Sequence, residues 1–211
     1  MVETSKERRA TKNRLTLTLL AIAFVLPVGL ASLLYAVGWR PAATINHGEL
    51  IEPPRVISDL ELRTLEGKRL RLRDLQGKWT FIYFGPARCL AACEHNLYKM
   101  RQVRLAQGEK AERVQRVFVV TDTRAIDLLT RVLQDYPGLV VITGSSTAVR
   151  TLAQEFVLPA GMPLDGLERI YLMDPTRRLM MSYPSDADAS GMRKDLARLL
   201  DSTFGGLPEK A

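Results

Sequence analysis

Trp79 to His95 is the stretch that decides the fold, and it reads Trp79-Thr-Phe-Ile-Tyr-Phe-Gly-Pro-Ala-Arg-Cys89-Leu-Ala-Ala-Cys93-Glu-His95. Residues 79–84 form a nearly continuous apolar run, which is typical of a central strand buried on both faces. A glycine-proline pair ends this run, and we expect a helix from about residue 90 to residue 107. The only two cysteines of the chain, Cys89 and Cys93, therefore lie where a buried strand gives way to a helix.

The spacing of the two cysteines predicts a reactive thiol pair. If Cys89 ends the loop and Cys93 lies in the first helical turn, their Cα atoms come to about 6 Å, which is within disulfide range. The unpaired amides of a helix start favour a thiolate, and Arg88 adds to this effect while Glu94 opposes it. A thiolate serves both disulfide exchange and the binding of Cu(I). We therefore predict Cys89 and Cys93 as the site, converging at an accessible helix entrance, with Cys89 as the attacking thiol.

A structural disulfide is the alternative reading of the same pair. It is disfavoured because so short a loop constrains the unfolded chain little, and because strand–helix switches are where α/β sheets place ligands. His95 points away from Cys93 on the expected helix, so we interpret it as a helix-surface residue. No Ser-His-Asp set, phosphate loop or carboxylate pair is present, so the chain carries no hydrolase or transferase signature. A thiol–disulfide oxidoreductase remains the one enzymatic reading.

Strand and helix patterns alternate along the rest of the chain. Alternating leucines on both sides of Glu66-Gly67 predict a β-hairpin over residues 60–75. Further expected elements are strands at 114–120 and 139–143, helices at 125–136, 145–156 and 189–203, and a second hairpin over 169–182. This order predicts an α/β, thioredoxin-like fold, with a central mixed sheet flanked by helices and an extra N-terminal β-hairpin.

Near the N-terminus, residues 15–39 contain no charged residue and no histidine. About 25 helical residues exceed the ~30 Å hydrocarbon core of a bilayer, so the segment predicts one transmembrane helix. Five basic residues precede it against two acidic ones. The positive-inside rule therefore predicts a cytoplasmic N-terminus and an exported domain. A cleaved signal peptide is the alternative, but its apolar region would be only about 7–15 residues long.

These patterns predict five segments, which are a cytoplasmic tail (1–14), a transmembrane anchor (15–39), a linker (40–58), a thioredoxin-like domain (59–204) and a flexible C-terminus (205–211). The linker is predicted because prolines and a glycine interrupt any regular pattern, and His47 is expected to be solvated there. The formal net charge of +7 is spread with alternating signs outside the basic tail. Without a basic stripe or a reader motif, nucleic-acid binding is not predicted.

Three stretches together resemble the Sco/SenC family. They are the Gly77–Gly85 strand text, the Cys89-x3-Cys93 pair and the text Tyr171-Leu-Met-Asp-Pro175. The resemblance covers most of residues 55–205 and implies a membrane-anchored, thioredoxin-fold protein of cytochrome c oxidase assembly. It implies partners that are an oxidase subunit or a copper chaperone with a cysteine pair. The layout is also similar to small Sco-like membrane proteins of proteobacteria, which implies a single-pass protein of the bacterial inner membrane with a periplasmic domain.

The chain departs from the family where copper is bound. Sco proteins carry a copper-ligating histidine after an aspartate, and here Gly166 follows Asp165. The resemblance therefore implies a divergent member that keeps its thiols, lacks the histidine and holds copper, if at all, as Cu(I) between Cys89 and Cys93. Three functions stay open, which are thiol–disulfide exchange in oxidase assembly, Cu(I) delivery, and a non-catalytic interaction protein with a structural disulfide.

Overall fold

The computed structural model describes residues 3–37, 46–166 and 168–202. The chain divides into two compact units, of which the second begins at Asn46. The predicted end of the anchor at residues 38–39, linker residues 40–45 and the C-terminal residues 205–211 lie outside the described residues.

The described part of the first unit contains one helix, α1 (Glu3–Ala36), which runs without a break through Pro27. Within it, Thr16–Leu34 is long and apolar enough to cross a membrane. Large apolar side chains such as Phe24 and Val25 are exposed along this stretch, at 75% and 68%. Such a helix needs an apolar surrounding, and α1 fits a single-pass membrane anchor.

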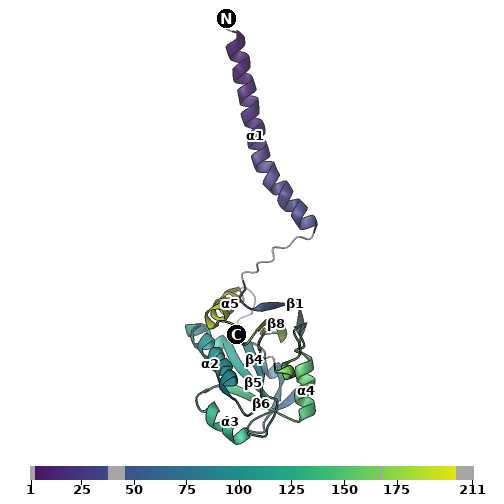
Figure 1. Ribbon diagram of the computed structural model, residues 1–211, viewed down its shortest axis with the longest axis vertical. Helices are drawn as coiled ribbons and strands as arrows, with labels where there is room; N and C mark the ends of the chain where they lie inside the picture. Colours follow the sequence, from purple (N-terminus) through teal and green to yellow (C-terminus); the bar gives the residue numbers. More distant parts are fainter. Residues whose placement is uncertain (1–2, 38–45, 167, 203–211) are drawn as a thin grey trace, which may run out of the picture. The chain divides into compact units, whose positions relative to one another are not determined.

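The second unit is built on one sheet with the strand order β1-β8-β7-β4-β5-β6-β2-β3 (Figure 1). Its strands are β1 (Glu49–Val56), β2 (Glu61–Thr64), β3 (Arg69–Arg71), β4 (Trp79–Gly85), β5 (Val114–Val120), β6 (Leu139–Thr143), β7 (Ile170–Met173) and β8 (Arg178–Tyr183). Its α-helices in the described residues are α2 (Ala91–Leu105), α3 (Ile126–Leu133), α4 (Ser146–Gln154) and α5 (Ala189–Ser202). Three short 3-10 helices are η1 (Leu72–Leu75), η2 (Gly108–Arg113) and η3 (Pro163–Asp165). The predicted strands at 114–120 and 139–143 are confirmed, and the predicted helices shorten by a few residues at their ends.

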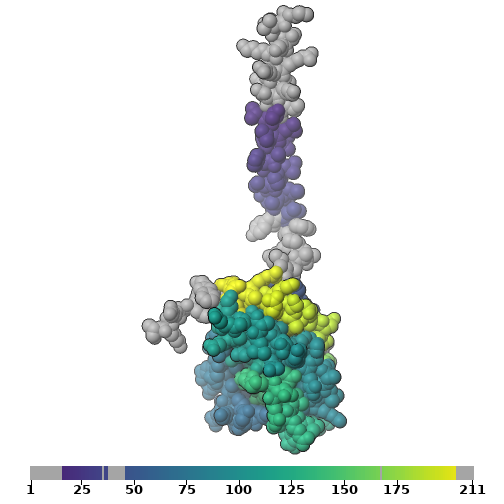
Figure 2. Space-filling view, turned by 90° about the vertical axis from the view of Figure 1, so that its left-hand side faces the viewer, coloured from purple at the N-terminus to yellow at the C-terminus, as the bar shows by residue number. Residues whose placement is uncertain are grey.

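Strand β4 lies inside the sheet, parallel to β5 and antiparallel to β7, so the sheet is mixed as predicted. All of its residues are buried. Phe81 and Tyr83 enter a core shared with α2 and α5, whereas Ile82 and Phe84 enter a second core under α4. Successive strand residues face opposite ways, so a continuous apolar run is what two cores require. Figure 2 shows α2 (teal) and α5 (yellow) packed side by side over the first core.

The first predicted hairpin is confirmed in its strands but not in its full length. Strand β2 pairs with β3, and Gly67 takes the left-handed conformation at the turn, with φ of 78°. The expectation that the strand continues over residues 72–75 is wrong, because these residues form η1. The Asp74 carboxylate accepts from the Arg71 amide at 2.7 Å, which closes a helical turn instead. Both leucines of η1, three residues apart, are thereby buried.

The expectation that residues 40–58 form one irregular linker is wrong for Glu49–Val56, which form the edge strand β1. This strand pairs antiparallel with β8, with a register shift between Leu50 and Arg55. The proline pair between these positions has no amide to donate, so pairing is interrupted there and resumes beyond it. An edge strand tolerates the interruption because one of its sides needs no partner.

His47 is also not a free linker residue. Its backbone amide and that of Gly48 both donate to the buried Asp195 carboxylate of α5. The folded unit thus begins before β1, about a dozen residues earlier than the predicted boundary at 59.

Candidate functional site

Cys89 and Cys93 form a disulfide, with their Cα atoms 5.2 Å apart. Strand β4 ends at Gly85 and α2 begins at Ala91, with Leu90 as its N-cap. The Leu90 side chain makes no capping hydrogen bond, so the helix start directs unpaired amides and the positive end of its dipole toward the cysteine loop. The prediction that both sulfur atoms meet at the start of this helix is confirmed.

The loop that carries Cys89 is held by the end of β5. The Ala87 amide donates to the Asp122 carbonyl at 2.8 Å, and the Thr121 amide donates to the Gly85 carbonyl at 2.9 Å. A glycine is needed at position 85 of this backbone, because the Cβ of any other residue there would lie only 2.9 Å from the Tyr83 ring. The disulfide therefore lies on a rigid part of the fold.

We expected the thiol pair to be accessible to solvent, but both cysteines are buried in the structure. Cys89 is 8% exposed and Cys93 is 3% exposed, and both belong to the core shared with α2 and α5. Their neighbours in the sequence are surface residues, since Arg88 is exposed and Leu90 is 65% exposed. The pair is covered because Cys93 lies on the inner face of α2. Cys89 is the slightly more exposed of the two and forms the outer edge of the pair.

A surface pocket of about 420 Å³ lies beside this edge, lined by Arg88, Asp122, Arg124, Ala125 and Leu128. Arg124 donates through Nε to both carboxylate oxygens of Asp122, at 3.0 and 2.9 Å. Hydrogen bonding from Arg124 lowers the pKa of Asp122, so the carboxylate stays ionised and the two charges balance. Arg88 makes no ion pair with any described residue, which leaves the pocket with a net positive charge next to Cys89.

Behind the disulfide, two buried polar groups lie close together without a hydrogen-bond partner among the described residues. They are the Tyr83 hydroxyl and the Asn96 side-chain carbonyl Oδ1. Asn96 follows Cys93 by three positions on the inner face of α2, and its Nδ2 donates to the Glu168 carbonyl at 3.0 Å. Burial raises the pKa of Tyr83 to about 12, and the neighbouring Asn96 side chain opposes that rise. The sequence reading missed both residues, although the i, i+3 spacing from Cys93 to Asn96 was a usable signal.

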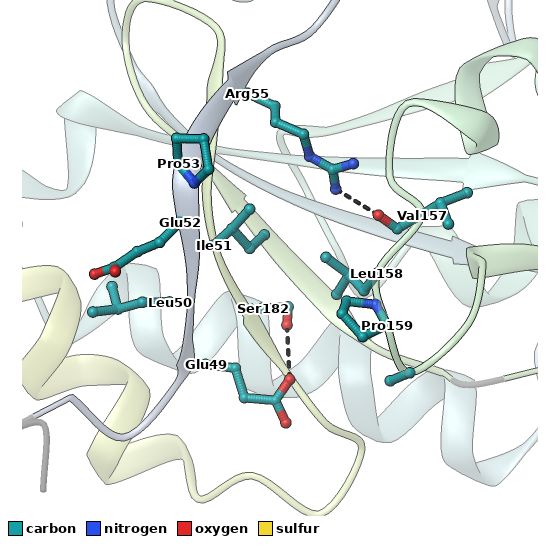
Figure 3. Close-up of a pocket in the computed structure, with 11 residues that line it drawn as sticks. Glu49, Leu50, Ile51, Glu52, Pro53, Arg55, Val157, Leu158, Pro159 and Ser182 are labelled. Carbon is teal, nitrogen blue, oxygen red and sulfur yellow. Dashed lines mark hydrogen bonds between the residues drawn. The ribbon is translucent and has the colours of Figure 1, made fainter. Parts of the chain in front are cut away.

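A second pocket, of about 490 Å³, lies where β1 bends away from β8 (Figure 3). Leu158 and Pro159 form one wall and β1 residues form the other, and Arg55 closes one end by donating to the Val157 carbonyl. Its lining contains no cysteine or histidine. Nothing in its chemistry connects it to the thiol pair.

The residues present do not fit a resident three-ligand copper site. No group of three or more potential ligands occurs among the described residues. Gly166, where the family resemblance implies a histidine, ends η3 in the left-handed conformation. His95 is exposed on α2 as expected, and His47 contacts Asp195 on α5. Copper would have only Cys89 and Cys93, and only once their disulfide is reduced.

Comparison with known proteins finds relatives of this chain in sequence and in fold. The model of the family described as "Transmembrane-like, thioredoxin-like, C-terminal domain" matches residues 79–202. Protein SCO2 homolog, mitochondrial, of Danio rerio is 31% identical over 103 residues, which cover 46% of this chain and 37% of that protein. The chain thus spans well under two thirds of that relative.

Two solved structures share the fold. Copper-bound ScoI of Arabidopsis thaliana matches with a TM-score of 0.60 and 21% identity, covering 70% of this chain and 99% of that one. BsSco, a member of the Sco family of cytochrome c oxidase assembly proteins with a disulfide switch, matches with a TM-score of 0.57 and 15% identity, covering 73% and 96%. The chain belongs to the transmembrane-like, thioredoxin-like C-terminal domain family and is a divergent Sco/SenC-like member of the thioredoxin fold.

Proposed function

We propose that this chain is a membrane-anchored thiol–disulfide exchange protein of cytochrome c oxidase assembly, with Cys89 and Cys93 as its reactive pair. The observation that carries the proposal is the Cys89–Cys93 disulfide at the start of α2, with Cys89 (8% exposed) at its slightly more exposed edge. A four-residue loop closed by a disulfide adds little stability, so redox chemistry is the better reason to keep it. The oxidase connection is taken from the relatives, since BsSco belongs to a family of oxidase assembly proteins.

Exchange would begin at Cys89. When the protein is oxidised, a target thiolate attacks Cys89 Sγ, the S–S bond breaks and its electron pair leaves on Cys93 Sγ. A second target thiolate then attacks the mixed disulfide, releases Cys89 and leaves the target as a disulfide. The reverse sequence reduces a target disulfide, with Cys89 as attacker and Cys93 as the resolving thiol.

The partner would be a protein with a cysteine pair, such as an oxidase subunit or a copper chaperone. The pocket beside Cys89 supports a partner of particular chemistry, because Arg88 is a cation without an ion pair to any described residue and Leu128 adds an exposed apolar surface. A target segment with an acidic and an apolar residue near its cysteine matches both features.

The proposed location is the bacterial inner membrane, with α1 as the anchor and the folded unit in the periplasm. The basic residues before Thr16 support this orientation, since basic flanks stay cytoplasmic. An oxidising periplasm is also where a disulfide persists.

Trapping in cells tests the proposal. Cys93→Ser should accumulate a mixed disulfide with a target, because the resolving thiol is gone, whereas Cys89→Ser should not. A Cys89→Ser variant that traps the same target, with none trapped by Cys93→Ser, would reverse the assignment. A midpoint potential below about −300 mV, together with full function of the double serine variant, would instead mark the disulfide as structural. The burial of both sulfur atoms is the observation that favours this structural alternative.

Delivery of Cu(I) is a second candidate, favoured by the copper-bound state of the Arabidopsis thaliana relative. Copper would then be cargo held by two thiolates in a near-linear pair. A tight one-to-one complex of the reduced full chain with Cu(I), lost in either single cysteine variant, would favour the carrier. If no such complex forms, thiol–disulfide exchange remains as the proposed function.

A further inference from the structure

The Tyr83 hydroxyl is an unexplained feature at the thiol pair. It is buried on the α2 side of β4, in the same core as Cys89 and Cys93, and it has no hydrogen-bond partner among the described residues. A buried polar group without a partner is destabilising, so natural proteins rarely keep one without a reason. Phenylalanine would fill the same space without that cost.

The residues around the Tyr83 hydroxyl indicate why a tyrosine is kept at this position. Asn96 lies beside it and follows Cys93 by three positions on the same face of α2, a spacing that places Cβ atoms about 5–6 Å apart. The Asn96 amide is tied to the Glu168 carbonyl at 3.0 Å. The hydroxyl is therefore an O–H donor without a partner among the described residues, in the core that also contains Cys93.

Opening of the disulfide creates a new acceptor in this space. When a thiolate attacks Cys89 Sγ, the electron pair of the S–S bond leaves on Cys93 Sγ, which is 97% buried in the disulfide and has little water to solvate it. A second thiol then releases Cys89, so that two electrons pass to the protein and the reductant becomes a disulfide. We propose that the Tyr83 hydroxyl donates a hydrogen bond to Cys93 Sγ in the reduced protein, and so sets how easily the disulfide is reduced. This inference rests on the proposed exchange function and names the group that tunes it.

Two further facts support this assignment. The raised pKa of Tyr83 keeps its proton in place at all physiological pH values, so it can act only as a donor to the thiolate. In the disulfide form Cys93 Sγ carries no charge, and the hydroxyl has no hydrogen-bond partner among the described residues.

The test compares Tyr83→Phe with Tyr171→Phe in the full chain. Tyr171 is a matched control because it is equally buried and its hydroxyl also lacks a partner among the described residues, but it lies in the other core, across the sheet from the cysteines. Each protein is equilibrated in dithiothreitol redox buffers, and the reduced fraction is counted by thiol alkylation and mass spectrometry. Tyr83→Phe should lower the equilibrium constant for reduction about tenfold, which is a shift of about 30 mV to more negative potential. Tyr171→Phe should stay within twofold of the unchanged protein.

Equal constants for Tyr83→Phe and the unchanged protein, or equal shifts in both variants, would overturn the inference. Unfolding curves of each protein in the oxidised and the reduced form give a second measurement. Tyr83→Phe should destabilise the reduced form relative to the oxidised form, and a change common to both forms would indicate a packing role only. A potential too low for exchange in the unchanged protein would defeat the proposed function, while the difference between the two variants would still decide this inference.

Discussion

The backbone amide of His47 donates to Asp195 Oδ2 at 2.8 Å, and the His47 imidazole Nδ1 lies 3.1 Å from Asp195 Oδ1. The same carboxylate accepts from the Gly48 amide at 2.9 Å and from the Tyr183 hydroxyl at 3.4 Å. Asp195 thus joins three parts of the folded unit, which are the segment before β1, the end of β8 and helix α5. Its side chain is 1% exposed, so if this carboxylate were removed, water could not replace it as the acceptor for the buried Gly48 amide and Tyr183 hydroxyl.

Asp195→Ala should lower the free energy of unfolding by about 2–4 kcal/mol, because it leaves the part-buried amide of His47 and the buried amide of Gly48 without their acceptor. Urea unfolding of the full chain measures this change. Asp201→Ala on the same helix is the control, since that side chain is 63% exposed and should cost less than about 0.5 kcal/mol. Equal losses in the two variants would contradict the role given to Asp195.

Gly48→Ala should also be strongly destabilising, since a Cβ there would lie 2.5 Å from the Tyr183 ring. Overpacking of this kind costs about 1–3 kcal/mol. At Gly144 a Cβ would meet its nearest neighbour at an ordinary 3.7 Å, so Gly144→Ala provides the comparison. Thermal unfolding of both variants checks the prediction, and a Gly48→Ala protein as stable as Gly144→Ala would show that the segment before β1 can shift away.

Arg88→Glu should change which thiols react fastest at Cys89. Arg88 makes no ion pair with any residue that the structure describes, so we expect its reversal to slow reduction by anionic glutathione several-fold relative to reduction by cationic cysteamine. The difference should shrink in 0.5 M salt, where the screening length falls to only a few ångströms. Arg193→Glu on α5, which makes the same charge change at another exposed position, should leave the ratio unchanged. A ratio that moves equally in both variants would mean that net charge alone is responsible.

Stability should fall above about pH 10. Burial raises the pKa of Tyr83 and of Tyr171 to about 12 and raises that of Tyr183 further, whereas the unfolded chain releases these protons near pH 10. The unfolded state therefore binds fewer protons than the folded state between pH 10 and 12. The stabilisation is complete below pH 10 and is lost as the pH rises through the folded values, by about 1 kcal/mol per tyrosine at pH 11.

Urea unfolding at pH 8 and pH 11, with tyrosinate absorbance as a second signal, measures this loss. Tyr171→Phe should reduce it, and Tyr98→Phe, at a position that is 51% exposed, should not. Lys99 and Arg116 act in the opposite direction, because burial lowers their pKa values, but they are two groups against three tyrosines. A free energy of unfolding that is constant from pH 8 to pH 11 would contradict the prediction.

The orientation in the membrane can be tested with single new cysteines and a membrane-impermeant maleimide. Ser190→Cys, at an exposed position of α5, should be labelled in intact cells after the outer membrane is permeabilised. Ser5→Cys, before the apolar stretch of α1, should be labelled only after the inner membrane is opened. The opposite pattern would place the folded unit in the cytoplasm.

The amino-acid sequence by itself determined the local features of this protein. The apolar run of β4 and the four-residue spacing of Cys89 and Cys93 are properties of neighbouring residues, and they were sufficient to predict the central strand, the helix start and the disulfide geometry. The apolar stretch within α1 could also be predicted from the sequence, because the ability of a helix to cross a bilayer depends on its length and composition.

Only the tertiary structure decided how these features are used. Strand β1 was missed because its prolines erase the local strand signal, and its pairing with β8 comes from residues more than a hundred positions away. The burial of Cys93 and its position in the same core as Tyr83 likewise depend on how α2 packs on the sheet. Burial and hydrogen-bond partners are relations between distant segments, and no local pattern of residues encodes them.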